Sequence, residues 1–411
     1  MSSSSLWWPG AHRVGPLMSD AALLAALVAV EQAWLDGLVA AGLAPPEASA
    51  DLTDVAADLD IEALAVAAEA GGNPVIPLVR TLRSSLERAG APEAARWLHR
   101  GLTSQDVLDT AVVLCARDTV NAARARLGEA VALLADLVET HRSSAMLART
   151  LTQPAVPTTF GAKAATWLHG LLDADEALAA VPFPIQYGGA GGTLAASVEL
   201  AGAGGARALG TALATALDLS PAAPWHTRRT PITRLGDAAV TTTDALGRIA
   251  NDVLALGRPE IGELRDGSAG GSSAMPHKAN PTLAVLLRRA ALASPPLAAT
   301  LHAAAAAQVD ERADGGWHLE WPTLAVLLRH ALVAADQAGD LLRGLHVDTD
   351  RMAARLAELD EDVRAEQRAI AEVTGRAPGA RYLGLSDVLV DEVLARAAAH
   401  PAAFGDHRIP G

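Results

Sequence analysis

Residues 107–141 read VLDTAVVLCARDTVNAARARLGEAVALLADLVETH, and this stretch decides the fold. Apolar residues recur along it at the spacing of one long helix, and Asp106, directly before it, is a residue type that caps helices. A helix of this length that is apolar around much of its circumference must be buried between neighbouring helices. The stretch therefore predicts an all-α fold built around long, packed helices.

Similar helical patterns surround this stretch. They run through residues 17–42, 51–70, 77–89, 158–180, 194–217, 231–256, 281–309 and 323–345. The first ends at Gly42 with Pro45 and Pro46 just beyond, as a helix end requires. Almost no stretch shows the alternation of a strand bounded by hairpin turns. We expect an N-terminal helical domain (1–105), a central long-helix domain (106–345) and a short C-terminal helical domain (346–411).

Composition and charge exclude several classes of protein. The chain has 411 residues, with 33 Lys and Arg against 47 Asp and Glu, and a net charge of −14, which argues against a nucleic-acid partner. Half of the residues are hydrophobic and 19% are charged, which excludes disorder as the main state. The start shows no secretory signal, and the apolar run 21–30 is too short to span a bilayer. We expect a soluble, cytoplasmic protein with no membrane partner.

The sequence also gives no reason to expect a metal or a nucleotide cofactor. The histidines lack the HExxH spacing or a similar arrangement of ligands. The glycine clusters 188–192 and 267–271 do not follow an obvious strand, so neither is a credible dinucleotide motif. Cys115 is the single cysteine and lies in the apolar sequence VVLCA, so we interpret it as a buried helix residue.

The most informative segment for chemistry is residues 267–281, GSAGGSSAMPHKANP, which directly precedes a long helical pattern. A glycine-serine stretch alone would favour a flexible linker before a helix that starts at a proline. The whole string is less ordinary, because residues 271–281 resemble the signature loop GSSxMPxKxNP of the fumarase/aspartase superfamily at every fixed position.

Two other segments agree with this resemblance. Residues 99–111, HRGLTSQDVLDTA, are similar to the first conserved region of the superfamily, and residues 149–155, RTLTQPA, are similar to the second. In isolation, Thr-Ser-Gln-Asp before a helix would be only an N-cap. Three matching regions in the correct order make coincidence improbable, and together the resemblance covers most of the chain. It implies an all-α fold with three helical parts and a central bundle of long helices.

The resemblance implies a chemistry for the loop. Members of the superfamily add or remove a proton on a carbon next to a carboxylate, and the difficult species is the aci-carboxylate, with two negative charges on its oxygens. By resemblance, Ser272 is the proton-transfer residue, activated by loop N–H groups and a nearby cation. Lys278, Asn280 and backbone N–H groups are suited to stabilising the aci-carboxylate. The loop glycines allow closure over the substrate.

Further residues are nominated for binding a polycarboxylate substrate. They are His99, Thr103, Ser104, Thr150, Gln153, His226, Arg228, Ser273, Met275 and Arg312. Thr103 and Ser104 would donate hydroxyl hydrogen bonds to a carboxylate. His99 either orients Thr103, meets the substrate or is a satisfied core histidine. His226 and Arg228 lie in a Pro/Trp-rich loop, where a surface or interface role is the alternative.

The roles of the candidate residues between positions 312 and 321 are also undecided from the sequence. Arg312 follows Asp310, a position where the family more often has histidine. Trp317, His318 and Trp321 could line a cavity, but aromatic residues near helix starts more often serve packing.

Two departures from the common pattern narrow the expected function. In fumarases, aspartases and adenylosuccinate lyases, a histidine of the second region pairs with a glutamate in the helix after the loop. Here these positions are Leu151 and Val285. Losing one partner would strand a buried charge, whereas losing both is self-consistent. This chain should not run the usual His-assisted elimination that yields fumarate.

One branch of the superfamily, the bacterial 3-carboxy-cis,cis-muconate cycloisomerases, is similar in lacking this pair. Residues 72–78, 186–193, 224–229 and 317–321 resemble that branch. The resemblance implies that a substrate carboxylate adds across a conjugated double bond to give 4-carboxymuconolactone, in protocatechuate (β-ketoadipate) catabolism. No metal, nucleotide or flavin is required. It also implies a homotetramer whose active sites each combine the three regions from three different subunits.

Two alternatives stay open at this point. One is an adenylosuccinate-type or argininosuccinate-type lyase that releases fumarate; Leu151, Val285 and Ala279, where the purine-pathway enzymes usually have arginine, speak against it. The other is a non-catalytic helical scaffold of the same fold. The intact set of Ser272, Lys278 and Asn280 disfavours a scaffold.

Overall fold

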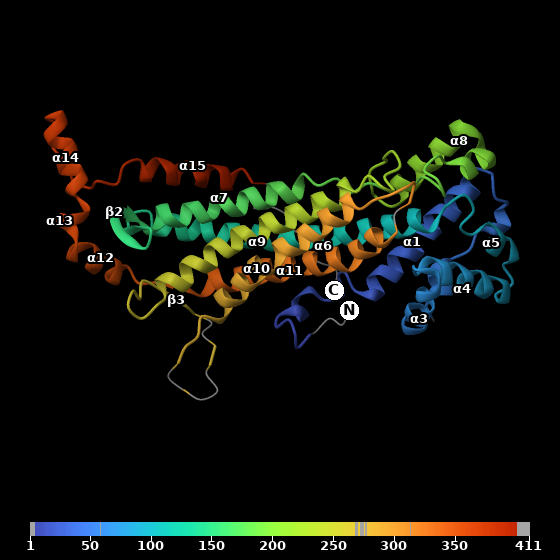
Figure 1. Cartoon of the computed structure of the whole chain (residues 1–411), viewed down its shortest axis with the longest axis horizontal. Coiled ribbons are helices and arrows are strands. Elements are labelled where there is room, and N and C mark those ends of the chain that lie inside the picture. The colour runs from blue at the N-terminus through green and yellow to red at the C-terminus, as the bar shows by residue number, and fades with distance from the viewer. Residues whose placement is uncertain are drawn as a thin grey trace. The chain divides into compact units, whose positions relative to one another are not determined.

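The computed structural model describes residues 5–57, 59–267, 270, 271, 275, 278–312 and 314–400. The predicted all-α fold is confirmed, since long helices make up most of the chain (Figure 1). The chain forms two compact units. Unit 1 comprises Met1–Asn121, Ala180–Ala239 and Pro295–His330, and unit 2 comprises Ala122–Ala179, Val240–Ser294 and Ala331–Gly411. The division into domains 1–105, 106–345 and 346–411 stays a prediction.

Four long helices contribute residues to both units. They are α6 (Ser104–Thr140), α9 (Thr230–Leu256), α10 (Thr282–Ala306) and α11 (Gly315–Gly344). Small residues allow these helices to approach closely. In unit 1 a Cβ added to Gly236 would lie 2.7 Å from a methyl group of Leu301, and in unit 2 one added to Gly247 would lie 2.4 Å from the Cβ of Ala291. The predicted burial of Cys115 on α6 is confirmed, and burial raises the pKa of its thiol to about 12.

Unit 1 holds the N-terminal helices and one later helix. These are the 3-10 turns Ala11–Val14 and Pro46–Ala48, α1 (Asp20–Ala40), α2 (Leu52–Ala56), α3 (Ile61–Gly71), α4 (Val75–Arg88), α5 (Pro92–Trp97) and α8 (Ala195–Ala216). Capping side chains start several of them: the Ser19 hydroxyl accepts from the N–H of Ala22 at 3.2 Å, and Asp60 caps α3. Because of the cap at Asp60, the expected single helix 51–70 is two helices.

Helix α1 is the one helix among the described residues whose length and hydropathy would also suit a membrane span. Its inward side chains instead form part of the core of unit 1. Trp34, Leu35 and Leu38 are almost fully buried, and so is the carboxylate of Glu31. A buried, hydrogen-bonded carboxylate and indole are typical of a helix packed in a protein interior.

Unit 2 holds α7 (Phe160–Ala179), the C-terminal helices and two small two-stranded sheets. The C-terminal helices are α12 (Thr349–Glu358), α13 (Asp360–Val363), α14 (Ala365–Thr374) and α15 (Ser386–Ala398). One sheet is the hairpin of β1 (Ala145–Thr150) and β2 (Gln153–Thr159), and the other pairs β3 (Leu264–Asp266) with β4 (Leu345–Val347); both are antiparallel. The sequence did not predict these strands. They matter because β1, β2 and β3 carry or flank two of the three motif regions.

Candidate active site

The first motif region lies at the start of α6, in unit 1, where Asp106 organises its surroundings. The helix begins at Ser104, and the buried carboxylate of Asp106 accepts the backbone N–H of Thr103 at 3.0 Å. The same carboxylate accepts the N–H groups of Gly188 and Gly189, both at 2.9 Å. Asp106 therefore fixes the Thr103–Ser104 pair against the glycine-rich loop that the sequence had linked to the cycloisomerase branch.

The predicted residue His226 joins this arrangement. Its Nε2 lies 3.1 Å from Oδ1 of Asp106, and the ring is only 4% exposed. A Cβ on Gly188 would lie 2.6 Å from Cε1 of His226, so the ring occupies space that only glycine leaves open. The buried Nδ1 of His226 has no hydrogen-bond partner among the described residues. Substrate binding by His226 stays a prediction.

The buried cation of this loop is Arg229, one residue beyond the nominated Arg228, which is exposed. Arg229 donates to Asp109 at 2.7 and 3.0 Å and to Glu320 at 2.6 and 2.9 Å. Burial alone would lower the pKa of Arg229, but the two carboxylates raise it above its ordinary value. The ion pairs of Arg229 with Asp109 and Glu320 link α6, the start of α9 and α11 inside unit 1. The sequence missed it because two adjacent arginines look equivalent before their helix register is known.

Arg312 lies beside the first motif region. Its Nη2 donates to the hydroxyl of Thr103, and its buried Nε has no partner among the described residues. A guanidinium next to a threonine hydroxyl presents donors of the kind that bind a carboxylate. The structure thus brings two of the nominated substrate-binding residues, Thr103 and Arg312, into direct contact.

Aromatic residues at the start of α11 form a compact group in unit 1. Trp317 packs edge-on against Trp321, with ring centroids 4.7 Å apart, and His318 lies 4.9 Å from Trp321. The indole of Trp317 donates to Asp109 at 2.9 Å, so this side chain is part of the buried network around Arg229. His318 is closer to the surface, and a Cβ on Gly72 would lie 3.3 Å from its Nε2.

The second motif region forms the tip of the β1–β2 hairpin in unit 2. Arg149 anchors it with two bonds to the fully buried carboxylate of Glu263, at 2.6 and 3.0 Å. The nominated Thr150 and Gln153 are paired across the turn and are exposed. Between them, Leu151 and Thr152 have φ values of 48° and 72°, a left-handed conformation that favours glycine or asparagine.

The third motif region follows β3, also in unit 2. Gly270 and Asn280 exchange two backbone hydrogen bonds of 2.9 Å, which tie the ends of the signature loop together. The amide of Asn280 donates to the carbonyl of Gly271 at 3.3 Å. Lys278 and Met275 are exposed. Ser272 and Ser273 lie outside the described residues, so their predicted roles rest on the resemblance.

The nominated residues fall into two groups by unit. His99, Thr103, Ser104, His226, Arg228 and Arg312 belong to unit 1, and Thr150, Gln153, Met275, Lys278 and Asn280 belong to unit 2. No hydrogen bond among the described residues joins Thr150 or Gln153 to Lys278 or Asn280. All of these assignments stay predictions.

Several supporting residues were not predicted from the sequence. Glu31, Asp109, Glu263 and Glu320 are buried carboxylates that hold motif residues or the network beside them. Asp109 lies inside the first motif region, so a buried role there could have been suspected. The other three lie far along the chain from their partners, and no local pattern marks them.

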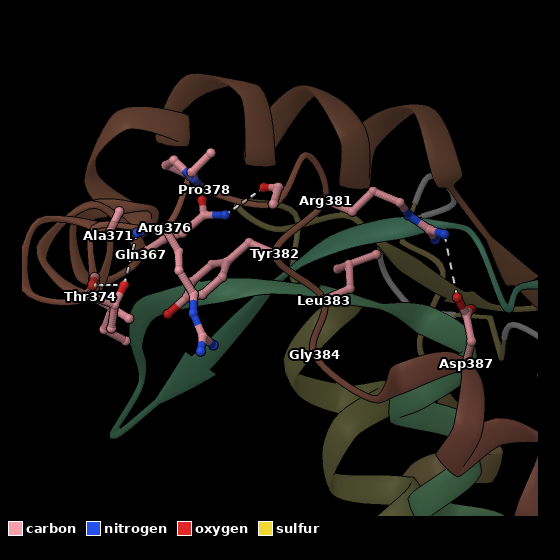
Figure 2. A pocket seen from close by; sticks show the side chains of 13 residues that line it. Gln367, Ala371, Thr374, Arg376, Pro378, Arg381, Tyr382, Leu383, Gly384 and Asp387 are labelled. Carbon is pink, nitrogen blue, oxygen red and sulfur yellow. Dashed lines mark hydrogen bonds and ion pairs between the residues drawn. The ribbon is translucent and has the colours of Figure 1, made fainter.

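Two pockets have walls that contain no residue of the three motif regions. One, of about 440 Å³, lies between α14 and the segment before α15, where Arg381 pairs with Asp387 at 3.5 Å (Figure 2). The other, of about 750 Å³, lies between α2, α3 and α4. Neither is lined by a nominated residue. Among the residues that the structure describes, no group of three or more His, Cys, Asp or Glu side chains could hold a metal ion.

Comparisons with known proteins agree with the motifs. A family model described as "Lyase" matches residues 25–293. The chain is 46% identical to nitrosuccinate lyase of Streptomyces davaonensis, over 82% of this chain and 73% of that protein. It is 38% identical to 3-carboxy-cis,cis-muconate cycloisomerase of Bradyrhizobium diazoefficiens, over 84% of this chain and 78% of that protein.

The structure is also similar to a solved one. The 3-carboxy-cis,cis-muconate lactonizing enzyme from Pseudomonas putida superposes with a TM-score of 0.81 at 33% identity, covering 94% of this chain and 85% of that one. With the three motif regions, these matches show that the chain belongs to the lyase family of the fumarase/aspartase superfamily and is an enzyme of that superfamily.

Proposed function

We propose that this enzyme is a 3-carboxy-cis,cis-muconate cycloisomerase, which closes its substrate to 4-carboxymuconolactone in protocatechuate (β-ketoadipate) catabolism. The observation that carries the proposal is the pair Leu151 and Val285. Both are exposed, at 95% and 51%, and neither can transfer a proton, at the positions where the fumarate-forming branches have histidine and glutamate. Four relatives with the cycloisomerase name, at 32–38% identity, support it.

The reaction makes modest demands on the protein. Nucleophile and electrophile belong to one molecule, so the enzyme has to fold the diene, neutralise its carboxylates and supply one proton. Attack by one carboxylate pushes the electrons of the double bond onto a second carboxylate, which becomes the aci-carboxylate. We assign its stabilisation to Lys278 and Asn280, and the proton transfer to Ser272. Thr103 and Arg312, in contact with each other, are suited to anchoring a further carboxylate.

A second candidate function is a nitrosuccinate lyase. The observation that favours it is the 46% identity to the Streptomyces davaonensis enzyme of that name. A nitro group departs as nitrite, a weak base that needs no proton from the enzyme. Leu151 and Val285 are therefore compatible with this elimination too. Both candidates form an aci-carboxylate and use the same signature loop.

One assay with two substrates separates the candidates. We expect purified enzyme to abolish the ultraviolet absorbance of 3-carboxy-cis,cis-muconate, and to release neither nitrite nor fumarate from nitrosuccinate. Nitrite release with an unchanged muconate spectrum would establish the second candidate. Fumarate release from adenylosuccinate or argininosuccinate would instead establish the lyase of that type. We expect Ser272→Ala to reduce turnover by orders of magnitude while leaving the oligomer intact.

We further propose a cytoplasmic homotetramer in which the three motif regions of each active site come from three subunits. The division of the motif residues between two units of one chain is compatible with such sharing. Exposed apolar side chains on the long helices, such as Leu292 at 69% and Val285 at 51%, support burial against other copies. Mass determination in solution tests the stoichiometry, and mixing two differently inactivated variants tests the sharing, because shared sites restore activity.

A further inference from the structure

His99 is held in a conformation that its own backbone disfavours. Its φ is 62°, in the left-handed region that L-residues other than glycine rarely adopt. Side chains from two other helices of unit 1 hold the chain on both sides of it. The guanidinium of Arg83 on α4 donates to the carbonyl of Leu98 at 2.7 Å, and the indole of Trp34 on α1 donates to the carbonyl of Arg100 at 2.7 Å. Strain of this kind persists only where the surroundings over-determine it, and it concentrates at functional sites.

The side chain of His99 is held as firmly as its backbone. Its Nδ1 lies 2.6 Å from Oε1 of Glu31 on α1, and the Glu31 side chain is fully buried. A carboxylate only accepts, so Nδ1 carries the proton of this hydrogen bond. The ring is 17% exposed, and its Nε2 has no partner among the described residues. Glu31 therefore fixes the ring so that Nε2 is the one nitrogen left for exchange.

The Glu31 carboxylate is bonded to the His99 ring through one of its two oxygens. The second oxygen of Glu31 is buried without a hydrogen-bond partner, so His99 is the side chain bonded to this carboxylate. With both ring nitrogens protonated, His99 and Glu31 form a neutral pair in the core of unit 1. Arg83 lies close enough to feel both neighbouring charges: burial and Arg100 lower its pKa, and Glu31 raises it. An imidazolium with a buried counter-ion can thus exist at a partly open position.

The proposed reaction needs such a group, because it consumes a proton. The substrate is a tricarboxylate, and the lactone keeps two carboxylates, since the third has become an ester. One proton therefore enters the site from water in each turnover and ends on the carbon next to the aci-carboxylate. The superfamily's histidine of the second region is Leu151 here and cannot carry it.

We propose that His99 is the group through which the site takes up this proton, and that Glu31 is the residue that positions it. The inference rests on the proposed function. In the step, the O–H bond of Ser272, the assigned proton-transfer residue, breaks, and its proton ends in the new C–H bond, which uses the electron pair of the aci-carboxylate. The N–H bond at Nε2 of His99 then breaks, and its proton restores the serine hydroxyl. Neutral His99 then takes its next proton from water. Glu31 keeps its hydrogen bond from Nδ1–H throughout.

His99→Asn is a sharp test of this role. The amide nitrogen of asparagine occupies the place of Nδ1, so the hydrogen bond to Glu31 can be kept, and asparagine tolerates a positive φ better than most residues. Only Nε2 is lost. We expect kcat to fall about 100-fold or more, with KM changed less than about threefold, an unchanged melting temperature and partial recovery of kcat on adding imidazole.

Two companion variants complete the test. Glu31→Gln keeps the shape and an acceptor but removes the charge, and we expect a fall in kcat of about tenfold at unchanged KM. His302→Asn is the matched control, because His302 bonds Asp237 at 3.0 Å on the exposed face of unit 1, and its kcat should equal that of the wild type. If His99→Asn does not fold, the kcat of Glu31→Gln alone tests the proposal.

Wild-type kcat in His99→Asn, a change in KM alone, or wild-type kcat in Glu31→Gln would overturn the proposal. Failure of the proposed function is a separate outcome, because it shows in the wild-type enzyme as a lack of turnover of 3-carboxy-cis,cis-muconate. The variants are compared with the wild type on whichever of the two candidate substrates the wild type turns over. In an elimination from nitrosuccinate, Nε2 of His99 would accept a proton instead of donating one. If imidazole restored the activity of His99→Asn on nitrosuccinate only, the proposed role of His99 in proton uptake would be wrong.

Discussion

The guanidinium of Arg229 binds the carboxylate of Asp109 through two contacts, Nη1 to Oδ2 at 2.7 Å and Nη2 to Oδ1 at 3.0 Å, and neither side chain exposes more than 1% of its surface. Glu320 takes the remaining side of the same guanidinium at 2.6 Å. One buried cation thus forms ion pairs with two buried carboxylates. This network lies directly beside the first motif region, since Asp109 is on the first turns of α6.

Arg229→Met should therefore destabilise the protein severely. It leaves Asp109 and Glu320 as two uncompensated buried carboxylates, and we expect a loss of about 3–5 kcal/mol in the free energy of unfolding. Denaturant unfolding measures it. Arg343→Met is the control, because Arg343 forms an exposed ion pair with Asp340 and should cost less than about 1 kcal/mol. Equal losses in the two variants would contradict the account of the network.

Asp252→Asn should lower the free energy of unfolding by an amount that depends on pH. Burial alone would raise the pKa of Asp252, but Lys163, Arg248 and the indole of Trp167 lower it below its ordinary value of 3.8. A lowered pKa means that the ionised carboxylate contributes stability above pH 3.8, and that this contribution is lost as the pH falls further. We expect the variant to be about 1–3 kcal/mol less stable at pH 7. The difference from wild type should narrow in acid melts below about pH 4; a gap that stays constant with pH would show that the charge is irrelevant.

Gly267→Ala should disturb the stem of the signature loop. A Cβ at this position would lie 2.1 Å from the carbonyl oxygen of Gly344, a backbone atom that cannot move aside without shifting the paired strands β3 and β4. We expect a loss of more than about 2 kcal/mol in stability and a lower kcat. Gly315→Ala meets nothing within 4 Å and should leave stability within about 0.5 kcal/mol of wild type. Similar melting temperatures for the two variants would refute the clash.

The backbone conformation at the tip of the β1–β2 hairpin should lower the stability of the protein and be needed for substrate turnover. Leu151 and Thr152 hold positive φ values, and an Asn-Gly pair satisfies such a turn without strain. We expect the double variant Leu151→Asn, Thr152→Gly to raise stability by about 1 kcal/mol and to lower kcat/KM, because the nominated Thr150 and Gln153 flank the tip. Calorimetry and steady-state kinetics measure the two effects. Unchanged kcat/KM would remove the hairpin tip from the substrate site.

Sequence patterns predicted the fold well where one element carries the signal. The long helix was expected from Asp106 to about His141 and is found at Ser104–Thr140, because its apolar spacing is continuous. Helix α11 was expected to begin at residue 323, and it begins at Gly315. Pro322 lies inside the helix, and the buried Trp317 and Glu320 pack on the part that precedes the proline.

The candidate site was only partly predictable. Thr103 and Arg312 were nominated separately, and only the structure shows their contact. Glu31 was not nominated, because in the sequence it is simply the charged residue that ends an apolar run. Its role depends on a partner that is distant in the chain, His99, and on complete burial, neither of which a local pattern contains.

The proposed function is lactonisation of a muconate, as opposed to elimination of a group from a succinate. The most direct measurement is the ultraviolet absorbance of 3-carboxy-cis,cis-muconate incubated with purified enzyme, with nitrite followed in a parallel reaction on nitrosuccinate. We predict a rapid loss of the diene absorbance and no nitrite. A stable diene spectrum together with nitrite release would contradict the account.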